Sequence, residues 1–101
     1  MSGNRLLYSE CLRIYEVEAS FIESLHEVGL IHVVDQEEER FIEYDDLSDL
    51  EQFIRWHYEM DINVQGIDAL RHMLERVKSL QSELDQLRHE LRFYKSGFSH
   101  T

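Results

Sequence analysis

Residues 70–94 read LRHMLERVKSLQSELDQLRHELRFY, and this stretch decides the fold. Apolar or aromatic residues recur along it at alternating intervals of three and four positions. This is the spacing of positions a and d in a heptad repeat. The members of this seam are Leu70, Met73, Val77, Leu80, Leu84, Leu87, Leu91 and Tyr94. A helix of this length spans roughly 38 Å at about 1.5 Å per residue, more than a small domain covers with its own core. The stretch therefore predicts a coiled-coil helix with a partner.

Charged residues flank the seam at the e and g positions, which indicates a paired helix and not a buried one. We expect a homodimer. In a parallel pair Glu83 would face Arg88 of the second copy. Glu90 would face Lys95, which is also attractive. In an antiparallel pair Arg76 would face Glu90, but Glu83 would face its own copy. The orientation stays open, as does the alternative of a monomer whose arm folds back on its own head.

The acidic residues outnumber the basic ones, 21 against 10, which gives a formal net charge of -11 at pH 7. Such a field repels nucleic acid and anionic membranes and attracts basic proteins. Cys11 is the only cysteine, so an internal disulfide and a four-thiolate zinc site are excluded. No stretch resembles a signal peptide, a membrane span or a lipidation signal. We therefore expect a cytoplasmic protein without membrane contact.

Two short amphipathic stretches near the amino end predict a helix-turn-helix. Ser9 is expected to cap a first helix over residues 10–15. Ser20, with Glu23 three positions later, matches a capping box and is expected to begin a second helix. The apolar face of this helix ends at Val28, and Gly29 follows where a left-handed helix terminator belongs.

A change of period after the second helix predicts a β-hairpin. β-Forming residues lie on both sides of the acidic run 35–39. The run contains neither Gly nor Asn, so we expect a longer loop and not a two-residue turn. Asp45 or Asp46 is expected to cap a third helix over residues 47–59. Residues 60–62 then link it to Asn63, the expected cap of the long helix.

The expected fold class is mainly α with a small β-hairpin wing. A winged helix-turn-helix head over residues 6–62 is followed by a C-terminal coiled-coil arm over residues 63–95, and the tails 1–5 and 96–101 are expected to be disordered. Gly66 lies inside the long helix, where glycine costs about 1 kcal/mol relative to alanine. Close helix packing is the simplest reason for it, and a contact with the third helix or a partner is another.

Nothing in the sequence indicates catalysis, and no cofactor or metal is expected. The six histidines are scattered over four expected elements without a zinc signature. His57 and Asp61 have a spacing that meets on a helix face, which we interpret as a solvated hydrogen bond. His72 and Glu75 are interpreted in the same way. Cys11 has acidic neighbours that disfavour its thiolate, so we interpret it as a small buried hydrophobe and not a redox thiol.

A winged helix-turn-helix by itself suggests DNA binding, but the residues present argue against it. In such folds the second helix enters the major groove, and Lys or Arg there and on the wing contact phosphates and base edges. Residues 21–36 contain neither Lys nor Arg, and Glu37, Glu38 and Glu39 belong to the expected wing tip. The pattern predicts a DNA-binding fold that lacks the Lys and Arg residues with which such folds contact DNA.

The order of head, hairpin, third helix and coiled arm, with LHEVGL at residues 25–30, resembles the MerR family. Where that family has an arginine in the recognition helix this chain has Glu23, and where its wing has one this chain has Ile42. MerR-like proteins usually pair antiparallel. A closer match is the chaperone-modulator branch, the CbpM-like family, which shares the head and has a segment similar to INVQGI at residues 62–67. The likeness covers about residues 7–91.

This resemblance implies a chaperone modulator that binds the J-domain of a CbpA/DnaJ-type co-chaperone and inhibits its co-chaperone activity. J-domains present a basic helix to their Hsp70 partner, which an acidic head would occupy by charge complementarity. The candidate contact residues, with Trp56 as an aromatic anchor, are Glu37, Glu38, Glu39, Glu43, Asp45, Asp46, Asp49, Glu51, Trp56 and Glu59. The alternative is that the carboxylates form a solvated surface and that Trp56 belongs to the core. A MerR-type DNA-binding transcriptional regulator is the second hypothesis, and a plain oligomerisation module is the third.

Overall fold

The computed structural model describes the backbone of residues 4–99 and the side chains of residues 4–95. The elements, in chain order, are β1 (Arg5–Leu7), α1 (Tyr8–Tyr15), α2 (Ala19–Glu27), β2 (Val33–Gln36), β3 (Glu39–Glu43), the 3-10 turn η1 (Tyr44–Asp46), α3 (Leu47–Tyr58) and α4 (Val64–Ser99). The expected mainly α fold is thus confirmed. The chain divides into two compact units, a head unit of residues 1–68 and an arm unit of residues 69–101. Because this boundary lies within α4, the first turn of that helix belongs to the head unit.

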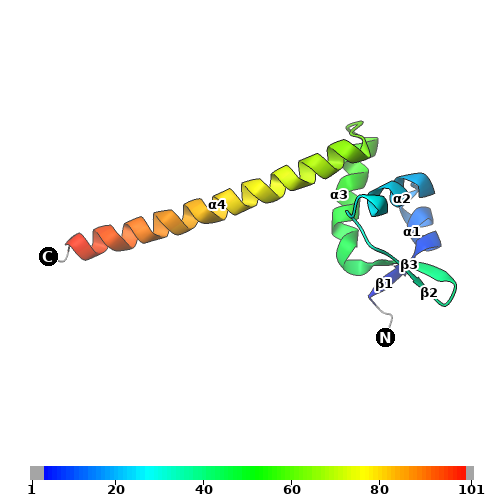
Figure 1. Cartoon of the computed structure of the whole chain (residues 1–101), viewed down its shortest axis with the longest axis horizontal. Helices are drawn as coiled ribbons and strands as arrows, with labels where there is room; N and C mark the ends of the chain where they lie inside the picture. Colours follow the sequence, from blue (N-terminus) through cyan, green and yellow to red (C-terminus); the bar gives the residue numbers. More distant parts are fainter. Residues whose placement is uncertain (1–3, 100–101) are drawn as a thin grey trace. The chain divides into compact units, whose positions relative to one another are not determined.

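The sheet of the head unit has three antiparallel strands in the order β1-β3-β2 (Figure 1). The sequence pattern predicted only the hairpin of β2 and β3 and assigned residues 1–5 to a tail. That assignment is wrong for Arg5, which pairs with Glu43, while Leu7 pairs with Phe41. The backbone N–H of Tyr44 also donates to the carbonyl of Asn4 at 2.8 Å. The second edge of β3 therefore orders a segment that is too short to be recognised as a strand by its own pattern.

The wing turns within two residues. Gln36 pairs with Glu39, so Glu37 and Glu38 alone form the turn, and the prediction of a longer loop is wrong. Their φ angles are 52° and 66°, in the left-handed region that a type I′ hairpin turn needs and that Asn and Gly usually supply. The twist of the paired strands favours this turn over a longer loop, although two glutamates must adopt an uncommon backbone conformation.

The starts of α1 and α2 differ from the prediction. Helix α1 follows β1 directly after Leu7, so Ser9 lies inside the helix and caps nothing. Helix α2 begins after Glu18, so Ser20 also lies inside its helix. Neither helix has a side-chain cap hydrogen bond at its start, and the expected capping box is wrong. The carboxylate of Glu23 instead accepts hydrogen bonds from outside α2.

Two predicted helix ends are confirmed. Gly29 has a φ of 81° and ends α2, and the N–H of Leu30 donates to the carbonyl of Leu25 at 2.9 Å. This is the bond expected beyond a left-handed glycine. At the start of α4, the Oδ1 of Asn63 accepts a hydrogen bond from the N–H of Gly66 at 2.7 Å. Asn63 is therefore the N-cap that the sequence predicted.

Helix α3 has an N-cap residue whose side chain is used elsewhere. Asp46 occupies the N-cap position, as one of the two predicted alternatives, but its carboxylate makes no cap hydrogen bond. It accepts hydrogen bonds from the backbone N–H of His32 at 2.8 Å and lies 2.9 Å from the Nδ1 of the same residue. The helix ends at Tyr58, one residue before the predicted end. Asp46 thus ties the start of the wing to the start of α3.

The core of the head unit draws apolar side chains from α1, α2, β3, α3 and the first turn of α4. Its buried members are Cys11, Val17, Phe21, Ile22, Leu25, Ile31, Ile42, Leu50, Phe53, Trp56, Val64 and Ile67. Cys11 is fully buried, as predicted. Trp56 is only 8% exposed, and its ring centroid lies 6.0 Å from that of Phe53. The structure therefore places Trp56 in the core and not on the surface as an aromatic anchor.

Helix α4 runs for 36 residues without a break. Residues 96–99, part of the segment expected to be disordered, belong to α4, which extends to Ser99. Residues 1–3 and 100–101, also assigned to tails, lie outside the described residues. A Cβ atom on Gly66 would lie 2.8 Å from the Cγ2 of Ile62 and 3.1 Å from the Oδ1 of Asn63. Gly66 thus allows the link before α4 to approach its own first turn.

Candidate partner-binding surface

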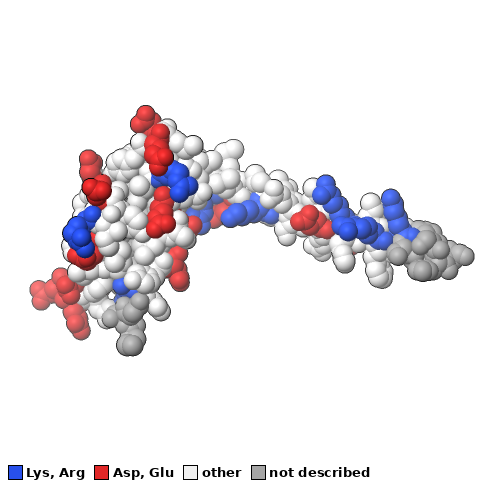
Figure 2. All heavy atoms as spheres, turned by 180° about the vertical axis from the view of Figure 1, so that it is seen from behind, with Lys and Arg blue, Asp and Glu red and all other residues white. Residues whose placement is uncertain are grey.

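Charge is divided unequally between the two units. Residues 1–68 contain seventeen Asp and Glu against four Arg, a formal net charge of -13. Residues 69–101 contain six Lys and Arg against four Asp and Glu, a formal net charge of +2. Figure 2 shows carboxylates spread over one face of the head unit and basic side chains along the arm unit. The excess negative charge of the chain therefore belongs entirely to the head unit.

Three of the four arginines of the head unit are paired with carboxylates of the same unit. The pairs are Arg5 with Glu43, Arg13 with Glu10, and Arg40 with both Glu23 and Asp35. Arg55, on the exposed side of α3, makes no such pair with a described residue. The cations of the head unit are thus mostly neutralised before any partner arrives.

One cluster joins the wing to the helix-turn-helix. The Oε2 of Glu23, on α2, accepts hydrogen bonds from the Nη1 of Arg40 and from the hydroxyl of Tyr8, both at 2.8 Å. The guanidinium of Arg40 lies 5.2 Å from the centroid of the Tyr8 ring. Its Nε donates to the Oδ1 of Asp35 at 3.0 Å. Strands β2 and β3, helix α2 and the first residue of α1 are therefore held together by four side chains.

Sequence reasoning missed most of this cluster. It placed Glu23 in a capping box and Tyr8 ahead of the first helix, and it gave Arg40 no role. The contacts join residues that are 15 and 17 positions apart, so no local spacing indicates them. The one available signal was that Arg40 is the only basic residue of residues 33–43 and lies among five carboxylates.

Burial and carboxylate neighbours keep two tyrosines neutral. Burial, followed by the hydrogen bond and the charge of Glu23, raises the pKa of Tyr8 to about 12, against the opposing charge of Arg40. Burial and the hydrogen bond to Glu51 raise the pKa of Tyr15 to about 12. Burial raises the pKa of the Cys11 thiol to about 11. Cys11 is therefore protonated at neutral pH, which agrees with its interpretation as an unreactive core residue.

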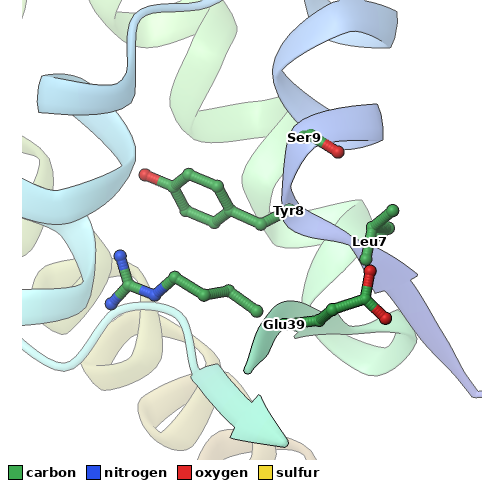
Figure 3. Close-up of a pocket in the computed structure, with 5 residues that line it drawn as sticks. Leu7, Tyr8, Ser9 and Glu39 are labelled. Atoms are coloured by element: carbon green, nitrogen blue, oxygen red, sulfur yellow. The ribbon is translucent and has the colours of Figure 1, made fainter. Parts of the chain in front are cut away.

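A hollow of about 220 Å³ lies beside this cluster. Its lining comes from the junction of β1 and α1 and from the start of β3, and consists of Leu7, Tyr8, Ser9, Glu39 and Arg40. In Figure 3, Leu7 and Glu39 lie side by side, while the Tyr8 ring points away from them toward α2. The hollow is open to solvent and its exposed lining is mainly apolar. A single water needs only about 15 Å³, so the hollow has room for more than one water.

The expected contact residues fall into three places on the head unit. Glu37, Glu38 and Glu39 form one exposed group at the wing tip, and no hydrogen bond or ion pair joins them to another described side chain. Glu43, Asp45, Asp46, Asp49 and Glu51 lie on the end of β3, η1 and the first half of α3. Glu59 follows the end of α3. The structure thus brings the wing-tip glutamates together but does not unite all the predicted residues in one group.

Several predicted contact residues already have partners inside the head unit. Glu43 pairs with Arg5 at 3.3 Å, and Asp46 binds His32. The hydroxyl of Tyr15 donates to the Oε2 of Glu51 at 2.8 Å. These carboxylates stabilise the head unit, so the wing tip retains more unused acceptor capacity than they do.

The described part of the chain contains no group of three His, Cys, Asp or Glu residues that could hold a metal ion. His57 points its Nδ1 at the carbonyl of Ile62, 2.8 Å away, and its ring stacks on Phe21 with centroids 4.5 Å apart. Its hydrogen bond thus fixes the link before α4, whereas the sequence suggested Asp61 as its partner. None of the described helices is both long enough and apolar enough to cross a membrane.

A family model described as MerR HTH family regulatory protein matches residues 6–89. The chain belongs to this MerR family. Searches of curated proteins and of solved structures gave no match. The match begins in β1 and extends into α4, so it includes the winged head and most of the seam.

The second helix and the wing, with which a winged helix-turn-helix reads DNA, contain a single Lys or Arg in this chain, Arg40. Helix α2 has neither Lys nor Arg, and Arg40 on the wing is bound by Glu23 and Asp35. A major-groove reader needs such cations for phosphates and base edges. Arg40 is thus the only Lys or Arg of residues 19–43, and it is paired with two carboxylates.

The arm unit of this MerR chain exposes an apolar seam. From Met73 to Tyr94 every predicted seam residue is exposed, with Met73 at 64% and Leu87 at 61%, and Leu70 is half-buried. Leu74 and Phe93 add further exposed apolar surface. A single helix in water leaves this seam uncovered, which is the pattern of a helix that pairs.

Proposed function

We propose that this MerR-family chain is a non-enzymatic regulator that binds the J-domain of a CbpA/DnaJ-type co-chaperone and inhibits its co-chaperone activity. The observation that carries the proposal is the formal charge of -13 on the head unit, with three of its four arginines already paired. A basic helix, such as the one a J-domain presents to Hsp70, is attracted by this field at long range. A bound head unit would then cover the surface that Hsp70 needs.

The resemblance to the CbpM-like branch supports the same partner. Its INVQGI segment, residues 62–67, has a clear local role in this chain. Asn63 caps α4, and Gly66 leaves the space that Ile62 occupies. The segment therefore fixes the first turn of α4, which belongs to the head unit.

The wing tip is the part of the acidic surface that we place at the contact. Glu37, Glu38 and Glu39 are exposed and make no ion pair with another described residue. A Lys or Arg of the partner can bind them without breaking an internal hydrogen bond. A contact at Glu51 or Asp46 would instead compete with Tyr15 or His32. Exposed ion pairs each contribute about 0–1 kcal/mol, so several are needed together.

DNA binding is the second hypothesis, and the charges oppose it. Duplex DNA carries one negative charge per about 1.7 Å, and affinity comes largely from cations that displace its counterions. Glu23 lies on α2 where such a cation would act, and it also neutralises Arg40 on the wing. The non-specific attraction that precedes sequence reading is therefore missing from the head unit.

We further propose that two copies pair through the seam of the arm unit. The seam is apolar and exposed, and its flanks carry both signs of charge. Sedimentation equilibrium should give a dimer, and Leu84→Asp in the middle of the seam should give a monomer. A monomer for the unaltered chain would refute the pairing. In a Cys11→Ser background, Leu91→Cys should form a disulfide between copies only if the pair is parallel.

The experiment that tests the function is calorimetric titration with the J-domain of the DnaJ-like protein from the same cell. We expect binding that weakens with added salt, slower J-stimulated ATP hydrolysis by Hsp70, and no retardation of DNA fragments at physiological salt. Absence of heat with every J-domain of the host would refute the proposal. Retarded DNA together with absent heat would favour the regulator hypothesis, and self-association alone the oligomerisation module.

A matched pair of variants locates the contact. The first neutralises the wing tip by Glu37→Gln, Glu38→Gln and Glu39→Gln. The second makes the same change of three charges at exposed glutamates of the helix-turn-helix, by Glu16→Gln, Glu18→Gln and Glu27→Gln. We expect the first to lower J-domain affinity by at least about tenfold and the second by a few-fold through the reduced field. Equal losses would refute a specific role of the wing tip.

A further inference from the structure

The hollow beside the wing combines apolar walls with one unpaired acidic group. Leu7 and the ring of Tyr8 supply apolar surface, and Ser9 supplies a small exposed hydroxyl that makes no hydrogen bond to another described side chain. Glu39 lies at the edge of the hollow, and the preceding residue, Glu38, belongs to the turn at the wing tip. The hollow therefore offers space for an apolar group directly beside exposed negative charge.

An anion is the wrong occupant for this hollow. Arg40 is the only cation among the described residues of its lining, and its Nη1 and Nε already donate to Glu23 and Asp35 at 2.8 and 3.0 Å. Its Cζ lies over the ring of Tyr8, 5.2 Å from the ring centroid. An incoming phosphate or carboxylate would approach a guanidinium that already binds two carboxylates and would also meet the charge of Glu39. A cationic occupant avoids both costs and gains an ion pair.

We propose that this hollow receives one protruding aliphatic or aromatic side chain of a basic protein segment, whose neighbouring Lys or Arg pairs with Glu39 and the wing tip. The inference rests on the proposed function, because the J-domain supplies the basic segment. It adds the place of the contact, at the junction of β1, α1 and β3. It also gives the recognition rule, an apolar side chain flanked by positive charge. Buried anchors of this kind carry most of the energy of an interface.

Two matched tryptophan variants test the place of the contact. Ser9 and Ser48 are both exposed serines at the second residue of a helix, and only Ser9 lines the hollow. Ser9→Trp should fill the hollow and lower J-domain affinity by at least about tenfold. Ser48→Trp should change the affinity by less than about twofold relative to the unaltered chain. The reverse result would overturn the hollow and place the contact on the first turn of α3. Circular dichroism of each variant checks that both remain folded.

A peptide titration tests the recognition rule without any J-domain. A capped, helical Lys/Leu peptide should shift the backbone amide resonances of Leu7, Ser9, Glu39 and Arg40 in a ¹⁵N-labelled sample, and Ser9→Trp should abolish these shifts. A Lys/Gln peptide of equal charge should leave them nearly unchanged. Equal effects of both peptides, or shifts elsewhere only, would overturn the proposal. Specific shifts with the Lys/Leu peptide but no J-domain binding would refute the proposed function. They would still support the proposal that the hollow receives an apolar side chain of a basic segment.

The charge of the hollow has its own test. Glu39→Gln should lower the affinity for both the J-domain and the Lys/Leu peptide by about threefold to tenfold. It should also reduce the dependence of this affinity on salt. Glu27→Gln, at an exposed glutamate on α2, makes the same change of charge away from the hollow. Equal effects of these two variants would show that only the total charge matters and would overturn the assigned role of Glu39.

Discussion

Replacing Glu38 by glycine should stabilise the head unit, although the change removes a side chain. Glu38 has a φ of 66° in a two-residue turn, where glycine carries no steric penalty. A left-handed conformation costs a residue with a Cβ about 1–2 kcal/mol. Glycine gives back about 0.4–1 kcal/mol through the greater freedom of the unfolded chain. The net gain in the free energy of unfolding should therefore be about 0.5–1 kcal/mol.

Equilibrium unfolding in urea measures this gain, with all variants at one protein concentration because pairing would add to stability. With a slope of about 1 kcal/mol per molar urea for a small domain, the midpoint should rise by about 0.5–1 M. Glu38→Gln serves as the control, since it removes the charge but keeps the Cβ in the left-handed region. We expect it to change the midpoint by less than half as much.

The result that would refute the reasoning is a midpoint that falls for Glu38→Gly. That outcome would mean that the turn is longer in solution, as the absence of Gly and Asn from the wing tip first suggested. Equal increases for Glu38→Gly and Glu38→Gln would instead attribute the strain to repulsion among the three glutamates and not to the backbone.

Three further predictions concern the start of α4 and the two half-buried tyrosines, Tyr8 and Tyr15. Asn63→Ala removes the cap of α4 and should lower the free energy of unfolding by about 1 kcal/mol. Asn63→Asp keeps a capping oxygen and should retain most of the stability that the cap provides. Thermal melting of both variants measures the difference. Gly66→Ala should destabilise by about 1 kcal/mol in urea unfolding, because overpacking against Ile62 outweighs the better helix propensity of alanine; a rise in stability would refute this packing. The raised pKa values of Tyr8 and Tyr15 mean that the unfolded chain loses these protons first, so stability should fall as pH rises from about 10 to 12. Unfolding midpoints across this range should fall less steeply in a variant with both tyrosines changed to phenylalanine.

The sequence predicted those features that a single residue or a local period determines. Gly29 ends α2 because the left-handed conformation there favours glycine, and Asn63 begins α4 because its short side chain reaches the free N–H groups of the first turn. The apolar positions of α2 and α3 include Phe21, Ile22, Leu25, Leu50 and Phe53, which are buried, whereas Val28, at the end of the expected apolar face, is 40% exposed. These signals lie within one helical turn, so they can be read without knowledge of the fold.

The features that were missed depend on contacts between distant segments. Strand β1 exists because β3 offers a second edge, and nothing in three residues indicates this. Ser9 and Ser20 have the right type and spacing for caps. However, α1 begins directly after β1 and α2 begins directly after Glu18, so both serines lie inside their helices. The partners of Glu23 are Tyr8 and Arg40, which come from other elements. The hollow depends on the same junction and could not be found from spacing.

The surface charges can change while the MerR fold remains, because different residues specify the two. The head unit keeps its core through fully buried residues such as Ile42 and Phe53, whose loss would cost several kcal/mol. Exposed ion pairs contribute only about 0–1 kcal/mol each, so an exchange of surface charge is energetically inexpensive. Glu23 shows how far such an exchange reaches, since one carboxylate both anchors the wing through Arg40 and removes the cation that a phosphate would need. A helix-turn-helix head can thereby carry a formal net charge of -13 while its folding depends on the same buried residues.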